Sequence, residues 1–122
     1  MTINTSLKIG FVGLGNLGEP LCNSLVKAGF TVTATDLNKD AAKRIMEGGA
    51  KWSDDVAGAC LGADVVITVL PSPSASRKVV EGAGGILENL REGGVWIEMS
   101  TTDIDDLKRI EGLAAQRGIS VL

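Results

Sequence analysis

Histidine and tyrosine are both absent from this chain of 122 residues. Their absence excludes a Ser-His-Asp triad, a Cys-His pair, a histidine-ligated metal and a tyrosine general acid supplied by this chain alone. Aromatic residues make up only 3% of the sequence, and 15 acidic residues outnumber 12 basic ones. No nucleic-acid partner is expected, because no basic stretch could follow a phosphate backbone. Trp52 and Trp96 are expected to pack in the interior rather than to stack on a ligand.

Cysteine and long apolar runs are also scarce. Cys22 and Cys60 lie far apart, in no CxxC pattern, so both are expected to be reduced and structural. Residues 1–15 lack the basic region, apolar run and cleavage site of a secretory signal. No segment reaches the roughly 18 apolar residues that a membrane helix needs. We therefore expect a soluble cytoplasmic protein with no membrane partner.

Glycine is the residue in excess, at 16 of 122, whereas there are only 3 prolines. This share, about 13%, is nearly twice the usual ~7%, without the joint proline enrichment of disordered or collagen-like chains. Hydrophobic residues make up 44% and charged residues 22% of the chain. The composition therefore fits one globular domain with a buried core.

Short β-branched apolar runs alternate along the chain with longer stretches of helical periodicity. The expected strands are Leu7–Val12, Thr31–Thr35, Ala50–Trp52, Asp64–Leu70, Val95–Met99 and Ile119–Leu122. The expected helices are Asn16–Ala28, Asp40–Glu47, Asp54–Leu61, Ser74–Val80, Ile86–Leu90 and Asp103–Gln116. Strands and helices that alternate in this way form parallel sheets through helical crossovers. The prediction is a single doubly wound α/β domain over residues 1–122, with helices on both faces of a parallel sheet.

A glycine-rich turn follows the first expected strand. It fits G-x-G-x-x-G and comprises Gly13, Leu14, Gly15, Asn16, Leu17 and Gly18. In the Rossmann-type dinucleotide fingerprint, the first glycine permits the tight turn and the second allows close approach of a pyrophosphate. The third glycine brings the helix close to the sheet, and N–H groups near Asn16 and Leu17 would face the diphosphate. The alternative is a glycine turn without a ligand.

An acidic residue, Asp36, ends the second expected strand, 18 positions after Gly18. The fingerprint places a carboxylate about 20 residues on, where it accepts hydrogen bonds from the adenosine ribose. Such a carboxylate also repels a 2′-phosphate, which favours NAD over NADP, although nearby Lys39 would soften that repulsion. The alternative role is to cap the turn Asp36–Asn38.

Two further segments follow expected strands at the edge of the sheet where ligands of such folds bind. Leu70 and Pro71 end the fourth strand and are expected to line the cofactor; the alternative is strand termination followed by a helix cap from Ser72. Ser100 and Thr101 follow the fifth strand, where hydroxyls could hold a substrate carboxylate or the nicotinamide ribose. Capping of the next helix is the alternative there.

These segments resemble the amino-terminal domain of the β-hydroxyacid dehydrogenase family, which includes 3-hydroxyisobutyrate dehydrogenases and tartronate semialdehyde reductases. The opening IGFVGLGNLGEPLCNSLVKAG is similar to the family's GxGxMGxPMAxNLxKAG, with matches at Gly13, Gly15, Gly18, Pro20, Leu25, Lys27, Ala28 and Gly29. Asp64–Pro71 looks like the family's D-V-V-I-x-x-L-P. Glu98–Thr101 looks like its substrate-site motif D-x-S-T, with glutamate in place of aspartate.

The resemblance implies hydride transfer between NAD(P) and a small β-hydroxyacid, such as 3-hydroxyisobutyrate or glycerate. In that family the catalytic lysine and a helical, dimer-forming second domain lie beyond this segment. We therefore expect the NAD(P)-binding part of a homo-oligomeric enzyme, with no catalytic residue and no metal site of its own. The alternative is a non-catalytic nucleotide-sensing or partner-interaction module on the same scaffold.

Overall fold

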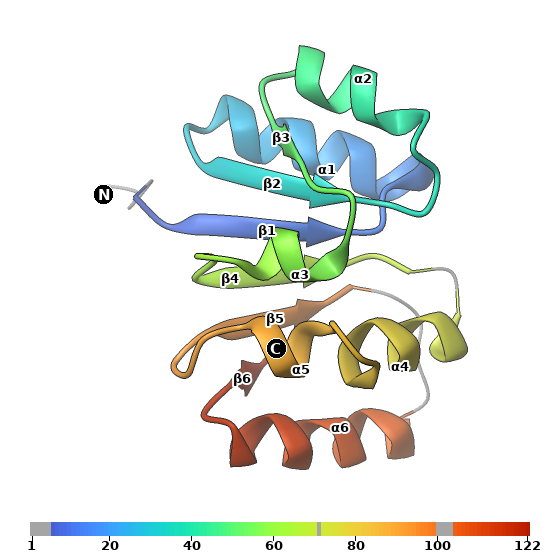
Figure 1. The fold of residues 1–122 in the computed structure, drawn as a ribbon, viewed down its shortest axis with the longest axis vertical. Coiled ribbons are helices and arrows are strands. Elements are labelled where there is room, and N and C mark those ends of the chain that lie inside the picture. The colour runs from blue at the N-terminus through green and yellow to red at the C-terminus, as the bar shows by residue number, and fades with distance from the viewer. Residues whose placement is uncertain (1–5, 71, 100–103) are drawn as a thin grey trace.

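The computed structural model describes residues 6–70, 72–99 and 104–122 (Figure 1). Its strands are β1 (Lys8–Val12), β2 (Thr31–Thr35), β3 (Lys51–Trp52), β4 (Val65–Thr68), β5 (Val95–Glu98) and β6 (Ser120–Val121). Its helices are α1 (Gly15–Lys27), α2 (Ala41–Glu47), α3 (Val56–Cys60), α4 (Pro73–Glu81), α5 (Ile86–Asn89) and α6 (Ile104–Gln116). All the expected strands and helices are present, with bounds within about two residues of the expected ones.

The six strands form one parallel sheet in the order β3-β2-β1-β4-β5-β6. The first strand is central, since Val12 at its end pairs with Thr35 of β2 on one side and with Thr68 of β4 on the other. The chain therefore winds outward from β1 to β3, returns to the centre, and winds outward again in the opposite direction. The predicted doubly wound fold is confirmed. In such sheets, ligands bind at the carboxyl ends of the strands where the winding reverses.

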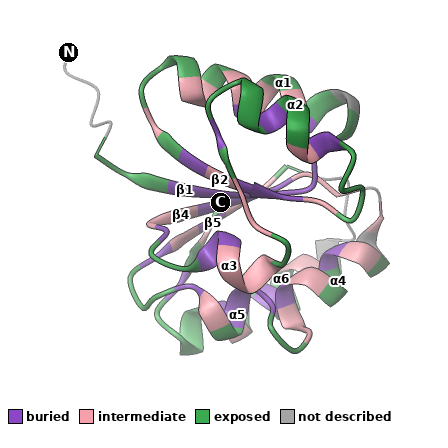
Figure 2. Ribbon diagram, turned by 45° about the horizontal axis from the view of Figure 1, so that its top comes forward, coloured by how far each residue is buried: buried purple, intermediate pink, exposed green. Residues whose placement is uncertain are grey.

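Helices cover both faces of the sheet. Helices α1 and α2 lie on one face, and α3 to α6 lie on the other (Figure 2). Each face has its own buried cluster, and successive strand residues alternate between the two: Phe11 belongs to the α1–α2 cluster and Val12 to the other. The alternation follows from the period of two along a strand.

The two cysteines lie in different clusters, Cys22 on the α1–α2 side and Cys60 on the opposite side. Both are free and fully buried, as expected. Burial raises the pKa of the Cys22 thiol to about 11 and that of Cys60 to about 12, because a thiolate is poorly solvated in an apolar interior. Both are therefore neutral core residues at physiological pH.

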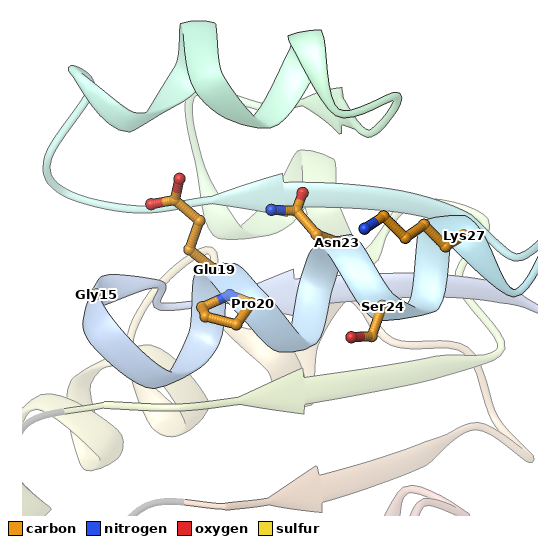
Figure 3. A pocket seen from close by; sticks show the side chains of 6 residues that line it. All are labelled: Gly15, Glu19, Pro20, Asn23, Ser24 and Lys27. Atoms are coloured by element: carbon orange, nitrogen blue, oxygen red, sulfur yellow. The ribbon is translucent and has the colours of Figure 1, made fainter.

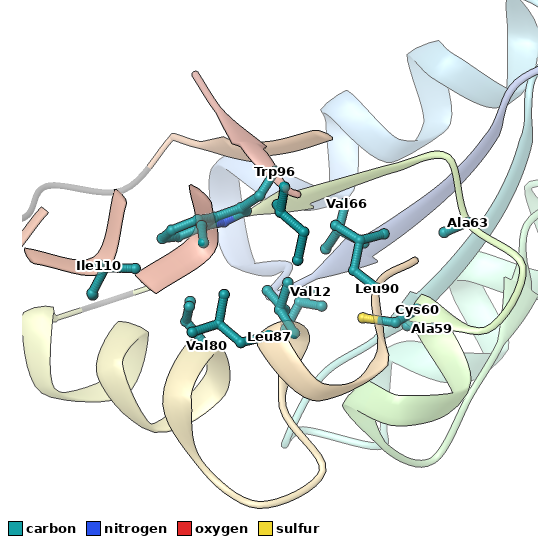
Figure 4. Packing of buried hydrophobic residues seen from close by; sticks show 13 residues of the cluster. Val12, Ala59, Cys60, Ala63, Val66, Val80, Leu87, Leu90, Trp96 and Ile110 are labelled. Carbon is teal, nitrogen blue, oxygen red and sulfur yellow. The ribbon is translucent and has the colours of Figure 1, made fainter. Parts of the chain in front are cut away.

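Trp96 of β5 is the largest fully buried side chain of the structure's described part. Its indole ring lies among apolar side chains that include Val66, Val80 and Ile110 (Figure 4). The indole Nε1 donates a hydrogen bond to Thr68 Oγ1 at 2.9 Å, so the polar atom of the ring is satisfied inside the core. The expectation that Trp96 is a packing residue is confirmed.

Charged side chains connect elements on the surface. Asp64, just before β4, accepts hydrogen bonds from Lys8 N at 2.8 Å and from Arg91 Nη2 at 2.9 Å. Arg109 of α6 binds both carboxylate oxygens of Glu81 on α4, at 2.6 and 2.7 Å, and also contacts Asp106. These hydrogen bonds and the neighbouring guanidinium groups lower the pKa values of Asp64, Glu81 and Asp106 below their usual range.

The lowered pKa values predict that the chain loses stability in acid. Stability from such carboxylates is fully present above their unfolded-state pKa values, near 4, and is lost as the pH falls through the lower folded-state values. The urea midpoint should therefore fall from pH 5 to pH 3. Asp64→Asn should flatten this fall, whereas Glu111→Gln, at an exposed position of α6, should leave it unchanged. Identical profiles for Asp64→Asn and the unmodified chain would contradict the assignment.

Candidate functional site

The glycine turn lies at the carboxyl end of the central strand. Gly13 has φ +88°, a left-handed conformation that favours glycine, and its N–H donates to the carbonyl oxygen of Thr35 at 3.0 Å. A Cβ atom on Gly13 would collide with the carbonyl oxygen of Val69. At Gly18, a Cβ atom would come within 2.6 Å of the Gly13 carbonyl oxygen and 3.2 Å of the Phe11 ring. Both glycines therefore allow α1 to begin directly against the sheet.

Gly15 differs, because its missing side chain leaves open space. Its φ is +66°, yet a Cβ atom there would meet no atom within 4 Å. The backbone of Gly15 can thus be approached closely from outside, which is what a pyrophosphate requires. The N-cap residue of α1, Leu14, provides no side-chain capping hydrogen bond, and the first turn of the helix contains no acidic residue. No side chain of the helix's own first turn therefore neutralises the positive end of its dipole, and the turn fits a dinucleotide's diphosphate.

Asp36 lies beside this turn, directly after β2. Its Oδ2 accepts a hydrogen bond from Leu14 N at 2.7 Å, and its Oδ1 accepts one from Asn38 N at 2.9 Å. The second contact confirms the alternative interpretation, that Asp36 caps the turn 36–38. The first was not anticipated: it connects the carboxylate to the glycine turn. Because a carboxylate can accept about four hydrogen bonds, these two contacts are compatible with a ribose role.

Lys39, the residue considered as a counter-charge for Asp36, pairs with a different carboxylate. Its Nζ lies 3.5 Å from Oδ1 of Asp54, and both side chains are largely exposed. The same Asp54 oxygen accepts a hydrogen bond from Trp52 Nε1 at 3.2 Å. An exposed pair of this kind is weak, but it draws the ammonium group toward Asp54.

The end of β4 meets the glycine turn. Leu70 is partly buried, and its Cδ2 lies 2.9 Å from the position that a Cβ atom of Gly13 would occupy. The structure thus brings Leu70, Gly13 and Asp36 to one edge of the sheet. Ser72 caps α4, since its Oγ accepts a hydrogen bond from Ala75 N at 3.1 Å, as the capping alternative predicts. Pro71, Ser100 and Thr101 lie outside the described residues.

Leu14 and Leu17, two further residues predicted to bind the cofactor, differ in the exposure of their side chains. The Leu14 side chain is buried in the α1–α2 cluster, and its N–H is engaged by Asp36. Leu17, in the first turn of α1, is 56% exposed. Only Leu17 of this pair is therefore free to contact a ligand through its side chain.

A polar network that the sequence interpretation missed connects the ends of β4 and β5. Thr68 Oγ1 donates to Glu98 Oε1 at 3.0 Å, and Ser76 Oγ of α4 donates to Glu98 Oε2 at 2.6 Å. Thr68 and Ser76 are buried and Glu98 is half-buried. The sequence did contain a signal for this network: Thr68 and Glu98 are polar residues that each end an otherwise apolar strand.

A hollow of about 530 Å³ runs along α1 and begins at Gly15. Figure 3 shows that Glu19 and Asn23 project from α1 toward α2, whereas Ser24 lies on the opposite side of the helix. Glu19 is bound to Arg44 of α2, with a shortest distance of 2.9 Å. This hollow meets the site only at Gly15 and otherwise follows the outer surface of the helix.

Comparison with known proteins fits this geometry. Residues 8–122 match the sequence profile of a family described as the NAD binding domain of 6-phosphogluconate dehydrogenase. The chain belongs to this family. As an NAD-binding domain it carries the glycine turn and the doubly wound sheet together, which confirms the predicted fold and the resemblance.

Relatives of this NAD-binding domain are dehydrogenases. The 3-hydroxyisobutyrate dehydrogenase of rat mitochondria is 38% identical over 95 residues, which are 78% of this chain and 28% of that protein. The Pseudomonas aeruginosa 3-hydroxyisobutyrate dehydrogenase is 33% identical over 114 residues, 93% of this chain and 38% of that protein. The chain thus spans less than two fifths of the length of these relatives.

Solved structures have the same fold. The Mycobacterium tuberculosis 3-hydroxyisobutyrate dehydrogenase, solved with L-serine, superposes with a TM-score of 0.85 at 31% identity, covering 94% of this chain and 38% of that one. An imine reductase from Myxococcus stipitatus, solved with NADP+, has a TM-score of 0.84 at 20% identity, covering 94% of this chain and 39% of that one. Within the described part of the NAD-binding domain, no helix is long and apolar enough to cross a membrane, and no cluster of ligating side chains could hold a metal.

Proposed function

We propose that this chain binds NAD through the turn Gly13–Gly18, with Asp36 on the adenosine ribose and Leu70 beside the cofactor. The observation that carries the proposal is the open space at Gly15, in a helix whose N-cap side chain makes no capping hydrogen bond and whose first turn contains no acidic residue. Pro71 and Thr101 complete the proposed cofactor site on the evidence of the sequence motifs, together with the first-turn residues Asn16 and Leu17.

The preference for NAD over NADP is part of this proposal. The Asp36 carboxylate lies against the glycine turn, and Lys39, the nearby cation in sequence, is paired with Asp54. A 2′-phosphate on the ribose would therefore meet a negative charge held in place by two backbone N–H groups. Because an imine reductase of the same fold is solved with NADP+ and a variant of it with NAD+, the fold alone does not choose between the dinucleotides.

For the whole enzyme, we propose hydride transfer between the nicotinamide and a small β-hydroxyacid such as 3-hydroxyisobutyrate. Ser100 and Thr101 would contact that substrate. From the family resemblance, we expect the catalytic lysine and the oligomer-forming domain to lie outside this segment. Lys27 and Lys108 of this chain lie on helices α1 and α6 and not in the loops that directly follow the strands. The chain by itself should accordingly bind dinucleotide without oxidising a hydroxyacid.

A titration tests this function. NADH and NADPH, added separately to the 122-residue chain, should both quench tryptophan fluorescence, with NADH binding at least about tenfold more tightly. The selectivity follows from the repulsion between Asp36 and a 2′-phosphate. Addition of 3-hydroxyisobutyrate and NAD should produce no NADH absorbance. No response to either dinucleotide would overturn the proposed site. Measurable turnover would overturn the proposal that this chain binds dinucleotide but lacks the catalytic residue.

A further inference from the structure

We propose that Thr68 and Ser76 are positioning residues for the nicotinamide half of the dinucleotide, acting through Glu98. This inference rests on the proposed function and adds residues that the glycine fingerprint does not include. Three separate elements meet in these contacts: Thr68 ends β4, Ser76 lies in α4, and Glu98 ends β5.

The contacts form a directed chain of hydrogen bonds. Trp96 Nε1 donates to Thr68 Oγ1 at 2.9 Å, and Thr68 Oγ1 in turn donates to Glu98 Oε1 at 3.0 Å. Ser76 Oγ donates to the other carboxylate oxygen of Glu98 at 2.6 Å. The Thr68 hydroxyl therefore uses both its acceptor and its donor capacity. Each carboxylate oxygen of Glu98 is matched to a different element.

The position of this network connects it with one half of the ligand. A doubly wound sheet binds a dinucleotide across its two halves, one nucleoside over each half. Asp36 follows β2, so the adenosine would lie over the β1–β3 half, and the nicotinamide nucleoside would lie over β4 to β6. Thr68 is the last residue of β4, two positions before Leu70, and Glu98 is the last residue of β5. Fixing these strand ends and α4 relative to one another sets the surface that the second nucleoside meets.

The burial of the network makes its geometry rigid. Thr68 and Trp96 are fully buried and Ser76 is 2% exposed. A buried hydroxyl or carboxylate that loses its partner keeps the penalty of desolvation, so the strand ends must shift if one member is removed. If these hydroxyls only stabilised the fold, their removal would weaken the binding of the whole dinucleotide or of none of it. If they position the nicotinamide half, their removal should weaken the contacts of that half selectively.

Thr68→Val and Thr68→Ser form a matched pair for the test. Valine keeps the volume of threonine without the hydroxyl, and serine keeps the hydroxyl without the methyl group. Dissociation constants for NADH and for ADP, which lacks the nicotinamide nucleoside, are measured by calorimetry on the 122-residue chain. Thr68→Val should weaken NADH binding about fivefold or more and ADP binding less than twofold. Thr68→Ser should keep the ratio of the NADH to the ADP dissociation constant that the unmodified chain has.

Ser76→Ala is the second variant, because it removes one hydroxyl from α4 and leaves the Trp96–Thr68 contact intact. It should also weaken NADH binding selectively, with a circular dichroism spectrum that matches the unmodified chain. Equal losses for NADH and ADP in both Thr68→Val and Ser76→Ala, or no loss in either, would overturn the inference while leaving the proposed function intact. Failure of the unmodified chain to bind NADH or ADP would overturn both.

Discussion

Gly15→Ala is expected to reduce NADH affinity by about a hundredfold or more while the chain stays folded. The new methyl group would occupy the open space beside the turn, where the proposed pyrophosphate approaches the backbone. A hundredfold loss corresponds to about 2.7 kcal/mol. The variant should still fold, because no atom lies within 4 Å of the new Cβ position. Only the left-handed backbone, φ +66°, adds a penalty of about 1 to 2 kcal/mol for a non-glycine residue.

The chain offers a matched control in Gly62, between α3 and β4. Its φ is +74°, and a Cβ atom there would also meet nothing within 4 Å. Gly62 precedes β4, so it lies at the opposite edge of the sheet from the glycine turn. Gly62→Ala should therefore lower the unfolding midpoint in urea by as much as Gly15→Ala does, with unchanged NADH affinity. Equal affinity losses in the two variants would show that backbone strain, and not the open space at Gly15, accounts for the loss of NADH affinity.

The sequence was sufficient to predict the order and the approximate bounds of all the described strands and helices. Periodicity carried that information: the run Thr31–Thr35 is rich in β-branched residues, and the spacing of Leu21, Leu25 and Ala28 puts all three on one face of a helix but not of a strand. The predicted bounds were less accurate where more than one residue could begin a helix. Asp54 and Asp55, for instance, both suit a helix start, and the structure uses Asp55, whose Oδ1 accepts a hydrogen bond from Gly58 N at 2.7 Å.

The contacts between distant residues were beyond sequence reasoning. A motif can place Asp36 at the end of a strand, but the hydrogen bond from Leu14 N depends on how closely β1 and β2 bring the two loops together. Thr68, Ser76 and Glu98 belong to three elements, and their side chains meet only when the crossover from β4 to β5 has packed. Tertiary geometry therefore decided which polar residues share a site.

The Asp36 carboxylate provides the second large expected effect, an altered choice between NADH and NADPH in Asp36→Asn. A carboxylate and a doubly charged phosphate about 5 Å apart repel each other by about 1.7 kcal/mol at the dielectric constant of water. Neutralising the side chain should therefore raise the affinity for NADPH relative to NADH by about fifteenfold to twentyfold. Part of the change should come from weaker NADH binding, because an amide cannot accept from both Leu14 N and Asn38 N as Asp36 does.

Glu111→Gln separates this local effect from the general change in charge. Both variants change the formal net charge of −3 by the same amount, but Glu111 is an exposed residue of α6 and lies far along the chain from the glycine turn. The NADPH-to-NADH affinity ratio, measured by parallel fluorescence titrations, should rise in Asp36→Asn and stay near that of the unmodified chain in Glu111→Gln. The rise in Asp36→Asn should also shrink at about 1 M salt, where the screening length of about 3 Å is shorter than the separation of about 5 Å. A ratio that shifts equally in both variants, or in neither, would remove Asp36 as the residue that selects NAD.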